Sequence, residues 1–347
     1  MKAVILVGGE GTRLRPLTLS VSKAVIPVVN QPLIFYILKW LSNYNLDEVI
    51  LIACYLPQRL KKVLGSKMFG MKIKYIYEDK PLGTGGAIKR AEKFMDATTL
   101  VMNGDIITDL NISSMIKFHR RKKSNLTLAL TPVENPSSYG VVETNKNNEV
   151  VRFLEKPSLD EISGKKANIN AGVYLIEPCI LKFMKKSKVY SIERDVFPKL
   201  LKNNFYGYIK KDIYWLDIGT PEKYKQINYD ILNGRLKVNL ALSGGTRSKN
   251  VKLGKNVKIF NPVNIGDGSI LEEGVIVKKF SIIGKNCLIG KNSVLEGCIL
   301  WNNVQVGEGC VLKDCIISDN SYIGDFSYLS GNLVMGPNST ITRYSKL

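Results

Sequence analysis

The first half of the chain alternates between short apolar runs and segments whose apolar residues recur at helical spacing. Four runs are predicted as strands, over residues 2–7, 48–55, 72–77 and 99–102. Three segments between them are predicted as helices, over residues 32–41, 57–64 and 85–95. Strands that alternate with helices predict a mostly parallel sheet with helices on both faces, which binds ligands at the carboxyl ends of its strands.

The middle of the chain departs from this alternation, because several strands follow one another with few residues between them. These strands are predicted over residues 126–133, 139–143, 150–155 and 171–176. A further strand over 214–218 leads into a helix that begins near Pro221. Short connections join antiparallel strands, so the sheet is predicted to be mixed.

A six-residue apolar period runs through the second half. It occupies Leu253, Ile259, Ile265, Leu271, Val277, Ile283, Ile289, Leu295, Leu300, Val306, Leu312, Ile317, Ile323, Leu329, Met335 and Ile341. The register slips by one residue after Leu295 and again after Leu312. This hexapeptide repeat predicts a parallel β-helix of about five coils, since three hexads make one coil.

A glycine-rich loop, GGEGTR over residues 8–13, follows the first predicted strand. Its glycines let main-chain N–H groups approach a ligand closely, and Arg13 adds a planar cation suited to phosphate oxygens. The loop is therefore predicted to cradle phosphates. An ordinary glycine-rich surface turn is the alternative.

The net charge of +20 is unevenly distributed. Residues 236–347 carry 13 Lys and Arg against 8 Asp and Glu, so 15 of the 20 excess positive charges belong to residues 1–235. A basic field around the phosphate loop would attract polyanionic small molecules. Nucleic acid is the competing partner, but the lysines are scattered and no RNA-binding aromatic motif is present, so we expect none.

The length of 347 residues favours two domains, which we place at 1–235 and 250–347. No apolar stretch approaches a membrane span, and we expect a cytoplasmic protein that binds no membrane. The six cysteines show no CxxC spacing, which predicts reduced, buried packing residues and no zinc site. The single histidine, His119, lies on a predicted helix away from the other motifs and is interpreted as structural.

Two aspartates, Asp105 and Asp217, follow predicted strands and could share one hard cation such as Mg²⁺. Each alone is more often a cap or turn residue.

Eight motifs occur in one order: LVGGEGTRLRPLT, Lys23, EDKPLGTGGA, NGD, YGVV, LEKP, INAGVY and LDIGTPE. This order resembles the sugar-phosphate nucleotidylyltransferases, or NDP-sugar pyrophosphorylases, over about residues 1–225. The resemblance implies an α/β, Rossmann-like domain with a mixed sheet, followed by a left-handed parallel β-helix. It also implies that a sugar 1-phosphate attacks the α-phosphorus of an NTP, which releases pyrophosphate. Such a transfer needs positioning and charge neutralisation rather than a catalytic histidine.

By position in these motifs, the resemblance assigns nucleotide binding to Leu6, Gly8, Gly9, Gly11, Thr12, Arg13, Lys23, Glu78, Gly83 and Thr84. It assigns binding of the sugar phosphate to Asn103, Tyr139, Gly140, Glu155, Lys156 and Asn170. It assigns catalysis to Arg13, Lys23, Asp105, Lys156 and Asp217, with the two aspartates as Mg²⁺ ligands. The chain has Lys23-Ala24 where the family often has Lys-Pro, which keeps the charge and loses only the fixed loop geometry.

The position of Glu78 in its motif implies contact with the base. A carboxylate only accepts hydrogen bonds, so it suits the paired donors of guanine and opposes the carbonyls of a pyrimidine. The stretch SIERDVFP, residues 191–198, also resembles mannose-1-phosphate guanylyltransferases. GDP-mannose synthesis is therefore favoured over a thymidylyl- or uridylyltransferase acting on glucose 1-phosphate, and over a non-catalytic regulatory subunit.

The repeat domain offers a second enzyme class, because some hexapeptide β-helices are acyltransferases. Those use a histidine as base, and residues 236–347 contain none. We therefore expect the β-helix to serve assembly of a homo-oligomer, or regulation.

Overall fold

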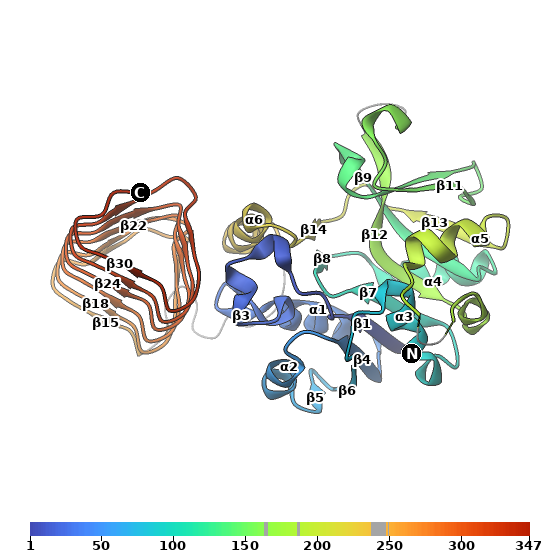
Figure 1. Ribbon diagram of the computed structural model, residues 1–347, viewed down its shortest axis with the longest axis horizontal. Helices are drawn as coiled ribbons and strands as arrows, with labels where there is room; N and C mark the ends of the chain where they lie inside the picture. Colours follow the sequence, from blue (N-terminus) through green and yellow to red (C-terminus); the bar gives the residue numbers. More distant parts are fainter. Residues whose placement is uncertain (163–165, 186–187, 237–247, 249) are drawn as a thin grey trace. The chain divides into compact units, whose positions relative to one another are not determined.

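The computed structural model describes residues 1–162, 166–185, 188–236, 248 and 250–347 (Figure 1). The chain forms two compact units: residues 1–10 with 37–217, and residues 11–36 with 218–347. The glycine-rich loop passes from the first unit to the second between Glu10 and Gly11. The domain boundaries 1–235 and 250–347 stay a prediction, and most residues between them lie outside the described part.

One mixed sheet forms the centre of the first unit. Its main path runs through β11 (Val150–Glu155), β10 (Gly140–Thr144), β12 (Lys166–Ile176), β7 (Thr99–Asn103), β1 (Lys2–Leu6), β4 (Glu48–Ala53), β6 (Met71–Tyr77) and β5 (Lys67–Met68). Beside β12 lie β9 (Leu126–Glu134) and then β13 (Phe205–Ile209). The four central strands β7, β1, β4 and β6 are parallel, whereas β12 is antiparallel to β7. The predicted mixed sheet is confirmed.

Helices connect and cover these strands. The α-helices are α1 (Leu33–Leu41), α2 (Pro57–Leu64), α3 (Gly83–Arg90), α4 (Ile112–Arg121), α5 (Phe197–Leu200) and, in the second unit, α6 (Pro221–Leu232). Short 3₁₀ turns cover Thr12–Leu14, Leu17–Leu19, Lys23–Val25, Ser42–Tyr44, Glu92–Phe94, Pro136–Ser138, Leu159–Glu161 and Pro178–Phe183, and a π-helical turn covers Ile192–Val196. The helix predicted over 85–95 was wrong at both ends, because α3 stops at Arg90 and a separate turn follows it.

The core of the first unit joins the parallel strands to the later elements. Val4, Ile50 and Val101 from the central strands share one buried cluster with Tyr174 and Phe197. Such continuous burial explains why these strands read as apolar runs.

Several short strands were not foreseen from the sequence, among them β13 and β8 (Ile106–Thr108). Among the described strands, β8 pairs with β14 (Trp215–Asp217) alone, in a two-stranded antiparallel ribbon apart from the main sheet. Their positions depend on pairing partners that are distant in the chain.

The second unit contains the β-helix, whose strands pair only in parallel and form three faces. The first face holds β15 (Lys252–Leu253), β18 (Ile270–Leu271), β21 (Leu288–Ile289), β24 (Gln305–Val306), β27 (Tyr322–Ile323) and β30 (Thr340–Ile341). The second holds β16 (Lys258–Ile259), β19 (Ile276–Val277), β22 (Val294–Glu296), β25 (Val311–Lys313) and β28 (Tyr328–Leu329). The third holds β17 (Asn264–Ile265), β20 (Ile282–Ile283), β23 (Ile299–Leu300), β26 (Ile316–Ile317) and β29 (Val334–Met335).

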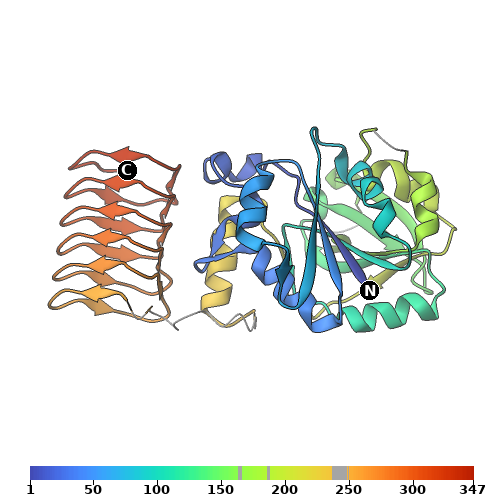
Figure 2. The same ribbon diagram turned by 90° about the horizontal axis from the view of Figure 1, so that it is seen from below.

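Figure 2 shows the coils of the β-helix stacked as successive layers. The sixteen hexad positions all lie in these strands, and those of the middle coils are completely buried, for example Leu271, Leu295 and Leu312. The hexapeptide prediction is confirmed. A short hairpin of β2 (Pro27–Val28) and β3 (Gln31–Pro32) also belongs to this unit.

Two predictions about single residues can be compared with the structure. All six cysteines are free, but Cys179 is exposed and Cys54 only half-buried, so the prediction that all of them are buried was wrong. His119 is buried on α4 and hydrogen-bonds Thr127 and Glu177, which fits a structural role. Within the described residues, no helix combines the length and apolar character that crossing a lipid bilayer requires.

Candidate functional site

The carboxyl ends of the parallel strands place several of the predicted residues at one edge of the sheet. β1 lies between β4 and β7, with Leu6 paired to Ile52 and to Asn103. The N–H of Gly104 donates to the Leu6 carbonyl at 2.9 Å. A Cβ at Gly104 would lie 2.5 Å from Val7 Cγ1, so only glycine fits between the strand ends. This close approach fixes the position of the backbone at the following residue, Asp105.

Glu78 follows β6 at the same edge and is the most unusual acid of the first unit. It is 7% exposed, and its Oε1 is buried with no hydrogen-bond partner. Burial raises the pKa of Glu78, whereas the positive charge of Arg90 lowers that pKa. An acceptor that is buried without a partner costs free energy unless a donor reaches it.

The space beside Glu78 is a cavity of about 580 Å³. It is lined by Pro57, Gln58, Lys61, Lys62, Tyr77, Glu78 and Asp79. Gly8 borders the same carboxylate, since a Cβ there would lie 3.5 Å from Glu78 Oε2. The phosphate loop and the unpartnered acceptor are therefore neighbours.

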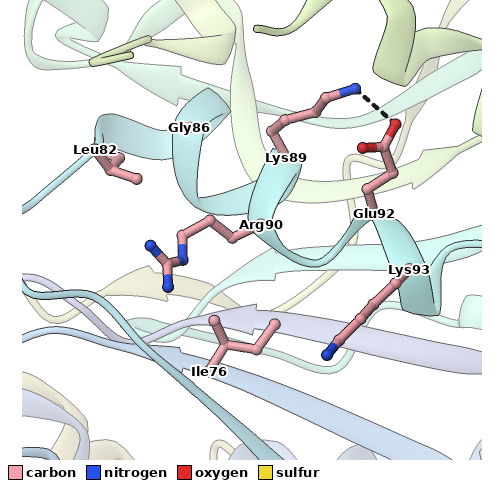
Figure 3. A pocket seen from close by; sticks show the side chains of 7 residues that line it. All are labelled: Ile76, Leu82, Gly86, Lys89, Arg90, Glu92 and Lys93. Carbon is pink, nitrogen blue, oxygen red and sulfur yellow. Dashed lines mark hydrogen bonds and ion pairs between the residues drawn. The ribbon is translucent and has the colours of Figure 1, made fainter. Parts of the chain in front are cut away.

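Arg90 faces a second cavity, of about 440 Å³, along α3 (Figure 3). Arg90 Nη2 donates to the carbonyl of Tyr77, the residue before Glu78, at 3.1 Å. Lys89 points away from Arg90 and pairs with Glu92 at 2.6 Å. Arg90 is thus the cation of α3 whose charge acts on the Glu78 carboxylate.

The ribbon of β8 and β14 brings the two predicted metal ligands to one end. Asp217 pairs with Ile106, the neighbour of Asp105 in the chain, so the two aspartates lie on adjacent strand ends. Asp217 is 9% exposed and Asp105 is half-buried. No three His, Cys, Asp or Glu side chains form a ready-made metal cage in the part of the chain that the structure describes. Two carboxylates completed by phosphate oxygens and water nevertheless fit Mg²⁺, which keeps several waters and binds few protein ligands.

Tyr139 holds one of these aspartates. Its hydroxyl donates to Asp217 Oδ1 at 2.8 Å, and its ring packs edge-on against Trp215 with centroids 5.4 Å apart. Trp215 in turn donates from Nε1 to the Ala171 carbonyl at 2.8 Å. Tyr139, which the sequence assigns to the sugar phosphate, thus also hydrogen-bonds one of the two predicted metal ligands.

Replacing Tyr139 by Phe removes this hydrogen bond and keeps the ring. We expect the Mg²⁺ concentration for half-maximal turnover to rise about tenfold or more, because a hydrogen bond to a charged group contributes about 1.5 kcal/mol or more. A Mg²⁺ titration of the initial rate measures this shift. An unchanged titration would mean that Tyr139 does not orient Asp217 for the metal.

The hairpin of β10 and β11 carries the predicted sugar-phosphate residues. Gly140 pairs with Glu155, and a Cβ at Gly140 would lie 2.9 Å from Glu155 Oε2. Lys156 donates its N–H to the Tyr139 carbonyl at 3.1 Å and has a left-handed backbone, with φ 51°. A positive φ is uncommon outside glycine, so the turn at Lys156 is held by its surroundings.

β12 adds a set of amides around a buried tyrosine. Asn170 donates from Nδ2 to the Tyr174 hydroxyl at 3.0 Å, and its Oδ1 accepts from Gly172 N–H at 3.0 Å. Gly172 has φ +70°, and a Cβ there would lie 2.9 Å from Asn103 Nδ2. Asn103 and Asn170 thus lie on either side of one glycine.

Glu193 joins this group and was not predicted from the sequence. Its Oε2 accepts from the hydroxyls of Thr84 and Ser191, both at 2.7 Å. Burial raises the pKa of Glu155, and the nearby negative charge of Glu193 raises it further. The pKa of Tyr174 is also raised, by burial and by the negative charges of Glu193, Glu155 and Asp105. The stretch SIERDVFP was the only sequence signal for Glu193.

The first turn of α3 and the segment that carries Glu193 pack backbone to backbone. A Cβ at Gly83 would lie 2.2 Å from the Tyr190 carbonyl oxygen, and Gly85 N–H donates to that oxygen at 3.0 Å. Thr84, between these glycines, also accepts from Ile192 N–H at 2.9 Å. The predicted nucleotide residues Gly83 and Thr84 therefore support Glu193.

Gly9 belongs to the first unit, whereas the predicted residues Gly11, Thr12, Arg13 and Lys23 belong to the second unit. Gly11 has φ +63°, and its carbonyl accepts from the Thr18 hydroxyl at 2.8 Å. Arg13 lies in the 3₁₀ turn after Gly11, and Lys23 begins another such turn. Their meeting with Asp105 and Asp217 stays a prediction.

Comparison with known proteins agrees with this arrangement. A family model described as nucleotidyl transferase matches residues 2–234. A second model, described as the LbH domain of EIF2B subunit epsilon, matches residues 246–347, in agreement with the left-handed parallel β-helix expected for the repeat.

Individual relatives match about two thirds of the chain. The chain is similar to a mannose-1-phosphate guanylyltransferase of Mycobacterium tuberculosis, with 37% identity over 67% of this chain and 65% of that protein. It is also similar to a D-glycero-α-D-manno-heptose 1-phosphate guanylyltransferase of Aneurinibacillus thermoaerophilus, with 36% identity over 67% of this chain and 98% of that protein. The crystal structure of HddC from Yersinia pseudotuberculosis complexed with GMP-PN superposes with a TM-score of 0.57 and 27% identity, over 66% of this chain and 99% of that one. The chain therefore belongs to the nucleotidyl transferase family.

Proposed function

We propose that this protein transfers guanylate from GTP to mannose 1-phosphate, which yields GDP-mannose and pyrophosphate. The observation that carries the proposal is the buried, unpartnered Oε1 of Glu78 beside the cavity of about 580 Å³. Guanine presents two adjacent donors, N1–H and N2–H₂, which match the two oxygens of a carboxylate. A pyrimidine base would set carbonyl oxygens against the same group.

The named relatives support both halves of this substrate choice. The Mycobacterium and Aneurinibacillus proteins are named guanylyltransferases, and each name contains a manno-configured sugar 1-phosphate. The similar structure of HddC is a complex with GMP-PN.

In the proposed reaction, an oxygen of mannose 1-phosphate forms a bond to the α-phosphorus of GTP, and the bond from that phosphorus to the bridging oxygen breaks. Lys156 would hold the attacking phosphate, while Arg13 and Lys23 would neutralise the departing pyrophosphate. Asp105 and Asp217 would bind Mg²⁺, which when present supplies positive charge at the phosphate oxygens. No general base is needed, since the attacking phosphate is already an anion.

The sugar would lie against the polar group around Tyr174. Glu155, Asn170 and Glu193 offer acceptors and a donor for its hydroxyls. Specificity follows from such groups because a substrate that lacks a matching hydroxyl leaves them unpaired. We place the reaction in the cytoplasm, which fits six free cysteines, and we expect the β-helix to assemble a homo-oligomer.

A substrate matrix tests the proposal. GTP, ATP, UTP and dTTP are each combined with mannose 1-phosphate and glucose 1-phosphate, and pyrophosphate release is measured. We expect kcat/KM to be at least about 100-fold higher for GTP with mannose 1-phosphate than for UTP or dTTP with glucose 1-phosphate. A preference for UTP or dTTP would contradict the interpretation of Glu78. Absence of turnover with every pair would favour a regulatory subunit.

A further inference from the structure

Three parts of the second unit that are far apart in the sequence pack into one body. They are residues 11–36, which we call the nucleotide segment, helix α6 and the β-helix. The nucleotide segment carries Arg13 and Lys23, to which the proposed function assigns the triphosphate.

Helix α6 lies against the two corners at which the hexapeptide repeat loses a residue. The slips fall between Leu295 and Leu300 and between Leu312 and Ile317. The first short corner contains Gly297, whose carbonyl accepts from the Tyr229 hydroxyl at 2.8 Å. A Cβ at Gly297 would lie 2.8 Å from that hydroxyl oxygen, so the corner fits α6 only with glycine.

The second short corner and the coil after it bind α6 through a lysine. Lys225 Nζ donates to Asp314 Oδ1 at 2.7 Å and to Asn332 Oδ1 at 2.9 Å. The coil before the first slip contributes Phe280, whose ring lies 5.3 Å from that of Tyr229. Helix α6 thus spans successive coils. The two corners at which the repeat is one residue short, which looked like irregularities in the sequence, lie at the contact with α6.

Most of the outward residues of the third face of the β-helix are buried, whereas those of the first face are exposed to solvent. On the third face the outward residues Ile282, Ile299 and Ile316 are 1–3% exposed. On the first face Ile270 and Tyr322 are 38% and 42% exposed. The third face is therefore a packing surface within the unit.

Hydrogen bonds continue from this face to the nucleotide segment. Trp301, 1% exposed, donates from Nε1 to the Tyr224 hydroxyl of α6 at 2.9 Å, and that hydroxyl donates to the Pro27 carbonyl. A second connection is direct, since Asn30 Nδ2 donates to Asn264 Oδ1 at 2.6 Å and to the Ile283 carbonyl at 2.7 Å.

A third connection leaves α6 itself. The N–H of Val29 donates to Asn228 Oδ1 at 2.7 Å. Residues 27–30 are thus held by three separate polar contacts that no local sequence pattern requires. Buried polar contacts of this kind are costly to leave unmade, so they define one position for the segment.

We infer that the β-helix positions the nucleotide segment for reaction with the triphosphate, with Trp301 and Asn264 as positioning residues. This role rests on the proposed function and goes beyond assembly or regulation.

The test uses the full chain with Trp301→Phe and, separately, Asn264→Ala. Tyr328→Phe, an aromatic substitution on the second face, is the matched control. Mass spectrometry measures the rate of hydrogen exchange at the backbone amides of residues 11–36 in each protein. Steady-state kinetics give KM for GTP and for mannose 1-phosphate.

For both variants we expect faster exchange in residues 11–36 and a KM for GTP raised about fivefold, since each loses about one hydrogen bond. KM for mannose 1-phosphate and exchange in the central strands are expected to match wild type and the control. A general loss of folded protein would instead lower kcat and leave both KM values unchanged.

Unchanged exchange in residues 11–36 would overturn the inference, and so would faster exchange without a change in KM for GTP. If the wild-type protein turns over no pair of substrates, the proposed function fails. The exchange data then still decide whether the β-helix holds the segment.

Discussion

Asp217→Asn is expected to lower kcat/KM by about 1,000-fold or more at fixed Mg²⁺, because one preorganised charge at the transferring phosphate is lost. Asn keeps the shape of the side chain and can still accept from the Tyr139 hydroxyl, which lies 2.8 Å from Asp217 Oδ1. The fold around β14 should therefore persist while the metal loses an anionic ligand. Pyrophosphate release over a range of Mg²⁺ concentrations measures the effect, and Asp105→Asn is expected to behave alike.

The opposite end of the same ribbon provides a matched control. Asp109 accepts from the Tyr214 N–H at 2.8 Å, away from the end that carries the two aspartates. Asp109→Asn is expected to retain turnover within about threefold of wild type, since it removes a charge-assisted bond only from an exposed turn. Equal losses in Asp109→Asn and Asp217→Asn would show that the ribbon matters as a scaffold and would remove the argument for a metal site.

Glu78→Gln is expected to lower kcat/KM for GTP about 10- to 100-fold, because a charge-assisted hydrogen bond to guanine becomes a neutral one. Gln can both donate and accept, so activity with UTP or dTTP is expected to rise relative to GTP. Asp79→Asn, an exposed acid that lines the same cavity, is the control and should leave base preference unchanged. An unchanged ratio of GTP to UTP turnover in Glu78→Gln would contradict the base-reading role.

The same substitution is expected to stabilise the folded protein at neutral pH. Burial raises the pKa of Glu78, with the Arg90 charge in opposition. An acid whose pKa is higher in the folded state favours unfolding once the pH exceeds its unfolded pKa, about 4.3. The thermal midpoint of Glu78→Gln should therefore lie above that of wild type at pH 7, and the difference should vanish below about pH 4. Equal midpoints at pH 7 would mean that the buried carboxylate carries no cost.

Local patterns in the sequence were sufficient for most elements of both units. The central strands were identified because burial on both faces makes each one a short apolar run. The β-helix was identified because each coil repeats the same inward position, as at Leu271, Ile289 and Val306 on its first face. Strands such as β8 and β13 were missed because their place depends on partners distant in the chain.

By itself the sequence determined which chemical groups are available, namely the glycine loop, the strand-end aspartates, Glu78 and the lysine of LEKP, and in what order the elements follow. Only the tertiary structure decided that Glu193 meets Thr84, that Tyr139 holds Asp217, and that residues 11–36 pack with the β-helix. Hydrophobic periods and short motifs reflect the interactions of a residue with its near neighbours in the chain. Contacts between residues about 80 to 250 positions apart leave no such record, because they are selected by packing and by the need to pair buried polar groups.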